Sequence, residues 1–256
     1  MFKNAIVRLP GSNFADGLTS GKFGKPEFAK ALKQHVAYCS ALKRCGLRVN
    51  VLPADLQYPD STFVEDAAIV TSRSAILSRP GVESRRGEVP SIREALQPFF
   101  PVFRQIEAPG TLDGGDVCDA GHQFFIGISQ RTNEEGARQL SEFLAEDGFS
   151  SSTVDIRDVK DALHLKSALA CIEGNRLVLW DALADMPQFR AFDLIRVTPE
   201  ESYAANCIGV NGWVLLPSGR PGLASRLERR GHKTLSLDMS EFEKMDGGLS
   251  CLSLRF

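Results

Sequence analysis

The sequence predicts an α/β protein of five similar modules arranged about a pseudo-symmetric axis, as in a propeller. First, the chain has 256 residues and is 43% hydrophobic, enough for a sizeable core, and we expect a single domain over residues 1–256. Second, helix-like segments alternate with short apolar runs typical of strands. Third, a polar or glycine-rich corner that leads into a strand recurs five times, about 40–50 residues apart, a spacing typical of propellers and arrays.

Five segments have the pattern of helices. Residues 25–46 repeat apolar side chains near a 3.6-residue period and stop at Gly46. The apolar face predicted for this helix consists of Phe28, Leu32, Val36, Cys39 and Leu42.

The other helices are recognised by their ends. Residues 91–100 and 240–244 each open with a capping box, formed by Ser91 with Glu94 and by Ser240 with Glu243. Residues 133–149 start at Asn133 as N-cap and stop at Gly148, and residues 222–231 end on a glycine.

The five corners carry most of the chemically reactive side chains. They begin at Phe63, Leu112, Leu163, Ala204 and Gly247. If equivalent corners face one axis, distant residues converge on a single central site: Glu65, Asp66, Asp113, Asp116, His164, Asn206 and Cys251. The alternative is an open, mixed α/β sheet in which the corners lie along one edge.

Charge and composition exclude several classes of protein. The net charge is −2, with 30 basic and 32 acidic residues and no basic stripe, which argues against nucleic acid as a partner. The first residues, MFKNAIVRLPG, lack the apolar region of a secretory signal. No apolar run approaches the ~20 residues that span a bilayer. We therefore expect a soluble, cytoplasmic protein without a membrane partner.

Six scattered cysteines predict free thiols, and four scattered histidines show no zinc-ligand spacing. Four of the cysteines fit the role of small apolar residues: Cys39, Cys45, Cys118 and Cys171. Cys207 lies in one of the corners, but no acid or base stands beside it. For Cys251 the residues alone leave two interpretations open, a buried structural thiol or a nucleophile. For His164 they leave a structural role or a proton shuttle.

Carboxylates gather around two apolar strand starts. Asp60, Glu65 and Asp66 surround the first, and Asp113 and Asp116 flank a glycine pair at the second. Buried carboxylates need a cation, because an unpaired charge is costly away from water. Mg²⁺ or Ca²⁺ sites usually show denser ligand spacing, whereas a guanidinium matches paired carboxylates with its planar fork.

Seven motifs together make the chain resemble the dimethylarginine dimethylaminohydrolase family, which shares a guanidine-modifying superfamily with arginine deiminases and amidinotransferases. They are PDSTFVED, SRPGVESRRGE, APGTLDGGD, ISQRTNEEGARQ, LHLKS, ESYAANCI and DGGLSCLSLRF. The similarity runs from DGLTSGKFGKP, which begins at residue 16, to the last residue in the same order. It implies the five-module α/β propeller of the penteins, and no metal or organic cofactor.

The resemblance also implies the roles of the catalytic residues in hydrolysis of N-methylated arginines to citrulline. Cys251 would attack the guanidino carbon of the substrate. His164 would protonate the departing amine and later activate water. Asp113, where some bacterial relatives have glutamate, would hold the guanidinium together with Asp66.

Seven residues are implied to place the substrate. Asp60, Glu65 and Asp66 form an acidic wall, Arg85 and Arg131 bind the α-carboxylate, and main-chain atoms of Leu18 and Met245 cover the amino-acid end. Other members often have valine or isoleucine where Met245 stands. Without the resemblance, both arginines would be interpreted as exposed surface residues.

Three alternatives stay open. A related arginine deiminase or citrulline-handling hydrolase would use the same residue types, as would an amidinotransferase. The fold also occurs in a non-enzymatic ribosome-binding factor, which we expect to lack the cysteine, histidine and acids. The expected partner is a small-molecule substrate, and a homodimer stays open as the assembly.

Overall fold

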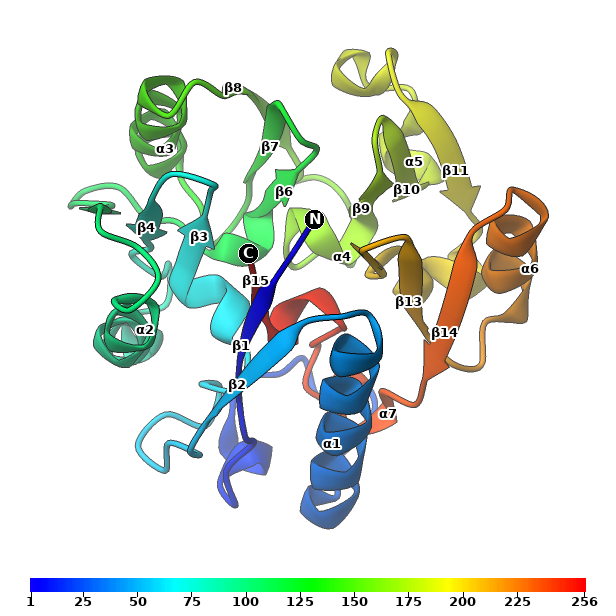
Figure 1. Ribbon diagram of the computed structural model, residues 1–256, viewed down its shortest axis with the longest axis horizontal. Coiled ribbons are helices and arrows are strands. Elements are labelled where there is room, and N and C mark those ends of the chain that lie inside the picture. The colour runs from blue at the N-terminus through cyan, green and yellow to red at the C-terminus, as the bar shows by residue number, and fades with distance from the viewer.

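The computed structural model describes residues 1–256 and contains five three-stranded sheets. Figure 1 shows these sheets arranged around the middle of the molecule, with the longer helices outside them and both termini near the centre. By sheet, the strands are β15 (Leu254–Arg255), β1 (Asn4–Arg8) and β2 (Arg48–Leu52); β3 (Ala68–Val70), β4 (Ala75–Leu77) and β5 (Phe103–Gln105); β6 (Val117–Asp119), β7 (Gln123–Ile128) and β8 (Ser150–Asp155); β9 (Leu169–Glu173), β10 (Arg176–Trp180) and β11 (Asp193–Val197); and β12 (Ile208–Val210), β13 (Trp213–Pro217) and β14 (Lys233–Leu237).

Every sheet has the same strand order. The first strand pairs antiparallel with the middle strand, and the middle strand pairs parallel with the third. A parallel pair needs a crossover, and a helix supplies it each time. These helices are α1 (Phe28–Arg44), α2 (Val89–Leu96), α3 (Glu134–Glu146), α5 (Asp181–Ala184) and α6 (Pro221–Arg229). In the first sheet β15 closes against β1, so the two ends of the chain meet in one module.

Burial follows strand position. The middle strands are buried over nearly their whole length and read as apolar runs such as AIL and FFIGI, as expected for strands covered on both faces. The third strands form outer edges and are less buried than the middle strands, as in the polar SSSTVD of β8 and KTLSL of β14.

The apolar core is divided into five clusters, each built from two neighbouring modules. For example, one cluster joins Phe125 of β7 to Leu177 of β10, and another joins Ile76 of β4 to Phe124 of β7. Because the apolar groups fill the seams between sheets, the polar groups of the corners are left for the centre.

The predicted corners precede the first strand of each sheet, as expected. The sequence suggested that each corner leads directly into its strand, but each corner contains a short helical turn. They are η2 (Val64–Ala67), η4 (Gly114–Asp116), α4 (Leu165–Ala168), η6 (Pro199–Ala205) and η7 (Ser250–Leu252). Four further short elements complete the chain: η1 (Phe14–Asp16), η3 (Glu83–Glu88), η5 (Pro187–Phe189) and α7 (Ser240–Glu243).

Gly114 permits the close contact between two corners. A Cβ at this position would lie 2.0 Å from the carbonyl oxygen of Glu65 and 3.2 Å from that of Ala68. Because backbone cannot yield as a side chain can, we expect Gly114→Ala to lower the free energy of unfolding by about 3 kcal/mol, at the upper end of overpacking costs. Chemical denaturation measures this change.

Gly121→Ala is the matched control. Gly121 has φ +86° but nothing within 4 Å of its added Cβ, so only backbone strain of about 1–2 kcal/mol opposes the change. If both variants lowered the free energy of unfolding by the same amount, the close backbone contact at Gly114 would not explain its effect.

The helices lie close to where the sequence predicted them, but some of the predicted apolar faces and N-terminal caps differ from the structure. Asn133 caps α3 as expected, because its side chain accepts a hydrogen bond from the Gly136 amide. The predicted apolar face of α1 is wrong in part: Val36 is 59% and Phe28 37% exposed. Tyr38, which the pattern omitted, is fully buried and donates its hydroxyl to the Leu249 carbonyl.

Neither predicted capping box forms. Helix α2 begins at Val89, before Ser91, with a proline in its first turn, where proline is well tolerated. The Ser91 hydroxyl accepts from Arg8 and donates to the Glu88 carbonyl instead. The Ser240 hydroxyl accepts from Lys30 and Gln34, and neither helix has a side-chain cap.

No helix of the structure combines the length and the apolar character needed to cross a membrane.

Candidate active site

Corners from four modules meet at a small cavity of about 40 Å³. Nine of the ten residues predicted for the site line it: Leu18, Asp60, Asp66, Arg85, Asp113, Arg131, His164, Met245 and Cys251. Residues separated by more than half of the chain therefore face one space, as the repeat predicted.

Cys251 lies on η7 and is half-buried. The Gly248 amide donates a hydrogen bond to its sulfur at 3.4 Å. Burial, together with the nearby carboxylates of Glu65 and Asp66, raises the pKa of the Cys251 thiol to about 12. In the free protein near neutral pH the thiol is therefore protonated, and it needs a nearby positive charge to become a strong nucleophile.

His164 stands at the N-terminus of α4 and forms an ion pair with Asp113. The Nε2 atom of His164 lies 3.0 Å from Oδ2 of Asp113, whose Oδ1 accepts a hydrogen bond from the Gly81 amide. Burial alone would lower the pKa of His164, but the carboxylates of Asp66, Asp113 and Asp116 outweigh it and raise the pKa to about 9. The imidazole is therefore protonated at neutral pH and can donate a proton.

Asp66 and Arg85 form a second buried pair. Asp66 accepts from Arg85 with one oxygen and from the Gly115 amide with the other. Burial opposes its charge, but His164 and Arg85 outweigh burial and lower the pKa of Asp66 to about 2. The Arg85 guanidinium also donates two hydrogen bonds to Glu88, at 3.0 and 2.8 Å.

The contacts of Arg85 differ from those of an exposed arginine. Its side chain is only 8% exposed, and two acids of the protein, Asp66 and Glu88, pair with the guanidinium from two sides. Burial raises the pKa of Glu88 to about 7 despite this pairing. Arg85 reaches the cavity, but its charge is already largely balanced by the protein.

Arg131 presents the opposite case. Its side chain makes no hydrogen bond or ion pair, and it lines both the small cavity and an adjoining groove of about 740 Å³. Beside it, the Leu18 amide donates to both carboxylate oxygens of Asp60, at 3.0 and 3.2 Å. The carbonyl oxygens of Leu18 and Met245 accept no hydrogen bond from the protein, so both are available to a ligand.

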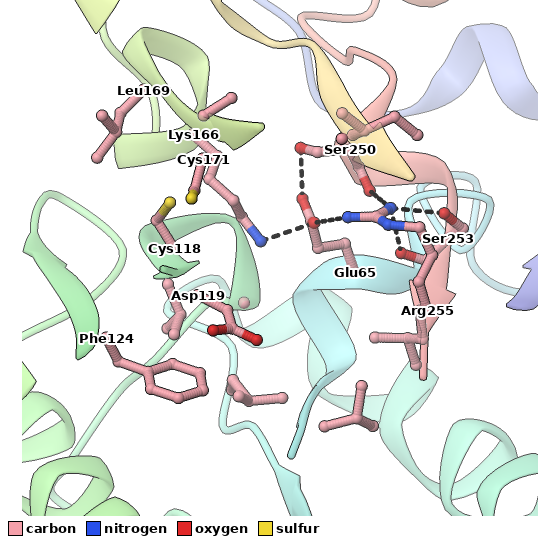
Figure 2. A pocket seen from close by; sticks show the side chains of 18 of the residues that line it. Glu65, Cys118, Asp119, Phe124, Lys166, Leu169, Cys171, Ser250, Ser253 and Arg255 are labelled. Carbon is pink, nitrogen blue, oxygen red and sulfur yellow. Dashed lines mark hydrogen bonds and ion pairs between the residues drawn. The ribbon is translucent and has the colours of Figure 1, made fainter. Parts of the chain in front are cut away.

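Glu65 is the one predicted site residue whose side chain lies outside the cavity. It points to the other side of the corners, into a second cavity of about 130 Å³ (Figure 2). There it accepts from Lys166 at 2.6 Å and from the Ser250 hydroxyl at 2.7 Å. The side chains of these two consecutive residues of η2 point in different directions, so Asp66 lines the cavity of Cys251 while Glu65 lines the second cavity.

Three residues outside the cavity support the site from behind, and one of them, Asp116, was expected from the repeat to lie at the centre. Asp116 is fully buried and accepts from Ser129, Thr132 and the Leu165 amide, which fixes the corner of Asp113 to that of His164. Lys166 stands two positions after His164, and Ser250 directly precedes Cys251. The only sequence signal for Lys166 and Ser250 was their adjacency to predicted site residues.

Asp66, Asp113 and His164 offer three ligand atoms within 4.8 Å of one another. Each is already committed elsewhere, Asp66 to Arg85 and His164 to Asp113. Because a metal ligand histidine must be neutral and this one is held protonated, we assign no metal to the cluster.

Known proteins resemble this chain over its whole length. The family model for eukaryotic N,N dimethylarginine dimethylhydrolase matches residues 22–207. The N(G),N(G)-dimethylarginine dimethylaminohydrolase of Pseudomonas aeruginosa is 48% identical over 257 residues, covering 100% of both chains. A structure of the Pseudomonas aeruginosa enzyme, a cysteine-to-serine variant complexed with citrulline, has a TM-score of 0.97 at 47% identity and covers 100% of both chains.

A more distant structure shares the fold alone. The N-terminal domain of ArgZ, a cyanobacterial arginine dihydrolase bound to its product, has a TM-score of 0.87 at 19% identity, covering 100% of this chain and 97% of the other.

Proposed function

Because the chain belongs to the dimethylarginine dimethylaminohydrolase family, we propose that it hydrolyses asymmetric dimethylarginine and monomethylarginine. The products are citrulline and dimethylamine or methylamine, and one water is consumed. The observation that carries this proposal is the convergence of a thiol, a protonated histidine and two buried carboxylates on one cavity.

In the first half of the reaction, the cationic guanidinium of the substrate enters between Asp66 and Asp113. Each carboxylate oxygen accepts one hydrogen bond from the protein and retains a second lone pair for the substrate. The positive charge beside Cys251 offsets the burial and the acids that hold the thiol protonated. The thiol releases its proton to solvent, and the resulting thiolate attacks the guanidino carbon and forms a C–S bond, which gives a first tetrahedral species.

His164 then gives its proton to the departing amine as the C–N bond breaks, which leaves a thiouronium on Cys251. The neutral imidazole takes a proton from water as the water attacks the same carbon. Collapse of this second tetrahedral species breaks the C–S bond and releases citrulline, while the remaining hydroxyl proton returns to the sulfur and restores the thiol. Asp113 orients the imidazole through both steps and stabilises its charged form.

The amino-acid end of the substrate lies at the mouth of the cavity. Arg131 has no protein partner and binds the α-carboxylate, whereas Arg85 contributes a charge already shared with Asp66 and Glu88. Asp60 and the carbonyls of Leu18 and Met245 receive the α-ammonium group.

Arg131→Ala is expected to raise KM about 10–100-fold and to change kcat about threefold or less, because a charge-assisted contact remote from the reacting carbon contributes to binding. Steady-state kinetics with dimethylarginine measure both constants. Arg131→Lys is the control and should raise KM less, since it keeps the charge but loses the planar fork. A collapsed kcat with unchanged KM would show that Arg131 acts in the chemical step.

A substrate panel tests the function itself. Arginine, monomethylarginine, asymmetric dimethylarginine, agmatine and citrulline are incubated separately with the protein, and products are identified by mass. We expect citrulline from the two methylated arginines and much less from arginine. Fastest turnover of arginine, or no turnover of any member, would overturn the proposal in favour of a deiminase or a binding protein.

The same proposal includes a single catalytic domain over residues 1–256 with the architecture of a five-module, pseudo-symmetric α/β propeller. The identical strand order of the five sheets and the five clusters between them support this description. A reduced, cytoplasmic setting suits a free catalytic thiol, since thiols persist there. The reaction needs no cofactor, and either a monomer or a homodimer could perform it.

A further inference from the structure

We propose that Lys166 is a positioning residue for the Cys251 nucleophile. From the side of the corners opposite the catalytic cavity, its ammonium neutralises Glu65 and so favours the charged state of the sulfur. This inference rests on the proposed function of Cys251 and extends the site to residues behind the catalytic cavity.

The contacts form one connected chain behind Cys251. Lys166 donates to Oε1 of Glu65 at 2.6 Å, and the other oxygen of Glu65 accepts the Ser250 hydroxyl at 2.7 Å (Figure 2). Asn206 completes the link: its side chain accepts from the Ser250 amide at 2.9 Å and donates to the Lys166 carbonyl at 2.8 Å. Corners of three further modules thus hold the residue that directly precedes the nucleophile.

Burial makes the charge balance of this chain important. Glu65 is 4% exposed, and the side chain of Lys166 is 15% exposed. In such surroundings, charges separated by a few ångströms interact more strongly than in water. Glu65 opposes ionisation of the Cys251 thiol, and Lys166 favours it with a smaller effect, so Lys166 offsets part of the influence of Glu65. Removing Lys166 leaves the Glu65 carboxylate with only the more distant Arg255 as a cationic partner.

Lys166 is the closest cation to Glu65. Arg255 is a second, more distant partner at 3.9 Å, and its guanidinium donates mainly to the carbonyl and hydroxyl of Ser253. Asp119 lines the same cavity, and its carboxylate accepts from the Gly121 amide. Titratable and charged groups face Cys251 and the contacts behind it from two sides. In or beside the catalytic cavity these are Asp66 on η2, Arg85 on η3, Asp113 before η4, His164 at α4 and Tyr203 on η6. In the second cavity they are Glu65 on η2, Asp119 on β6, Lys166 on α4 and Arg255 on β15.

The test is the rate at which iodoacetamide alkylates Cys251 in the absence of substrate, at pH values well below the pKa of the thiol. Under these conditions the rate follows the thiolate fraction, and peptide mapping separates Cys251 from the partly exposed Cys171. We expect Lys166→Met to slow alkylation about tenfold, equivalent to about one pKa unit, and Glu65→Gln to accelerate it by at least a similar factor. The rate of the double variant should lie between the rates of the two single variants.

A purely structural role gives a different result. If the ion pair only held the loop in place, both single variants would change the rate in the same direction and the double variant would change it most. That outcome, or unchanged rates, would overturn the proposal. Should Lys166→Met fail to fold, the opposite sign expected for Glu65→Gln still decides the question.

Asp119→Asn serves as the matched control and should change alkylation much less than Glu65→Gln does, because it removes a carboxylate from the same cavity that has no hydrogen bond to Glu65 or Ser250. Alkylation does not depend on turnover. Failure of the protein to form citrulline would therefore refute the proposed function without affecting this result, and the reverse also holds.

Discussion

Replacing Cys251 by serine is expected to lower citrulline formation at least about a thousandfold, because no other group of the cavity can form the covalent intermediate. A serine hydroxyl ionises far less readily than a thiol, and it meets the same burial and the same acids that hold the thiol protonated. Substrate binding should persist, since the guanidinium contacts come from Asp66 and Asp113. Quenched-flow product analysis and calorimetric binding measure the two effects separately.

Cys171→Ser is the matched control for this experiment. Cys171 is the other cysteine that is only partly buried, and it lies outside the catalytic cavity. We expect nearly full activity from this variant. Residual turnover in Cys251→Ser above about one per cent of normal would contradict covalent catalysis by Cys251.

His164→Gln is expected to lower kcat by about 10²–10⁴-fold, the usual contribution of a positioned acid and base. Glutamine can still donate a hydrogen bond to Asp113 but cannot transfer a proton at neutral pH. The pH profile gives a second readout. Because the raised pKa of about 9 keeps His164 protonated below that value, the unaltered enzyme should lose kcat/KM as pH rises through about 9.

The variant should lack this alkaline decline, because its side chain does not titrate. The comparison requires kcat/KM of the unaltered and the variant protein, measured over the same pH range. An identical decline in both would assign the titration to a group other than His164.

The repeat of corners predicted that Asp66, Asp113, His164 and Cys251 lie around one cavity, but Glu65, Asp116 and Asn206, which it also placed there, lie outside that cavity. Middle strands such as β7 and β10 are visible in the sequence because both of their faces are buried and they read as apolar runs. The outer strands β8 and β14 carry no such signal, since one edge is open to solvent and their side chains are mixed. The predicted capping boxes do not form because the hydroxyls of Ser91 and Ser240 accept hydrogen bonds from residues far away in the sequence. A local sequence pattern cannot reveal such partners.

The direction of individual side chains was harder to predict than their proximity. Glu65 and Asp66 are adjacent acids of one motif, yet only Asp66 faces the catalytic cavity. Arg85 was expected to be available for a carboxylate, but buried acids of the protein occupy much of its guanidinium. Both outcomes depend on which face of a short helical turn a residue occupies, and turns of three or four residues show no periodicity.

The measurement that tests the central claim most directly is product mass after incubation of the protein with asymmetric dimethylarginine in ¹⁸O-labelled water. The proposed reaction predicts citrulline with one labelled oxygen, together with an equal amount of dimethylamine and no free ammonia. Ammonia with methylated citrulline would mean that the other C–N bond is cleaved. Unlabelled or absent citrulline would contradict hydrolysis at this site.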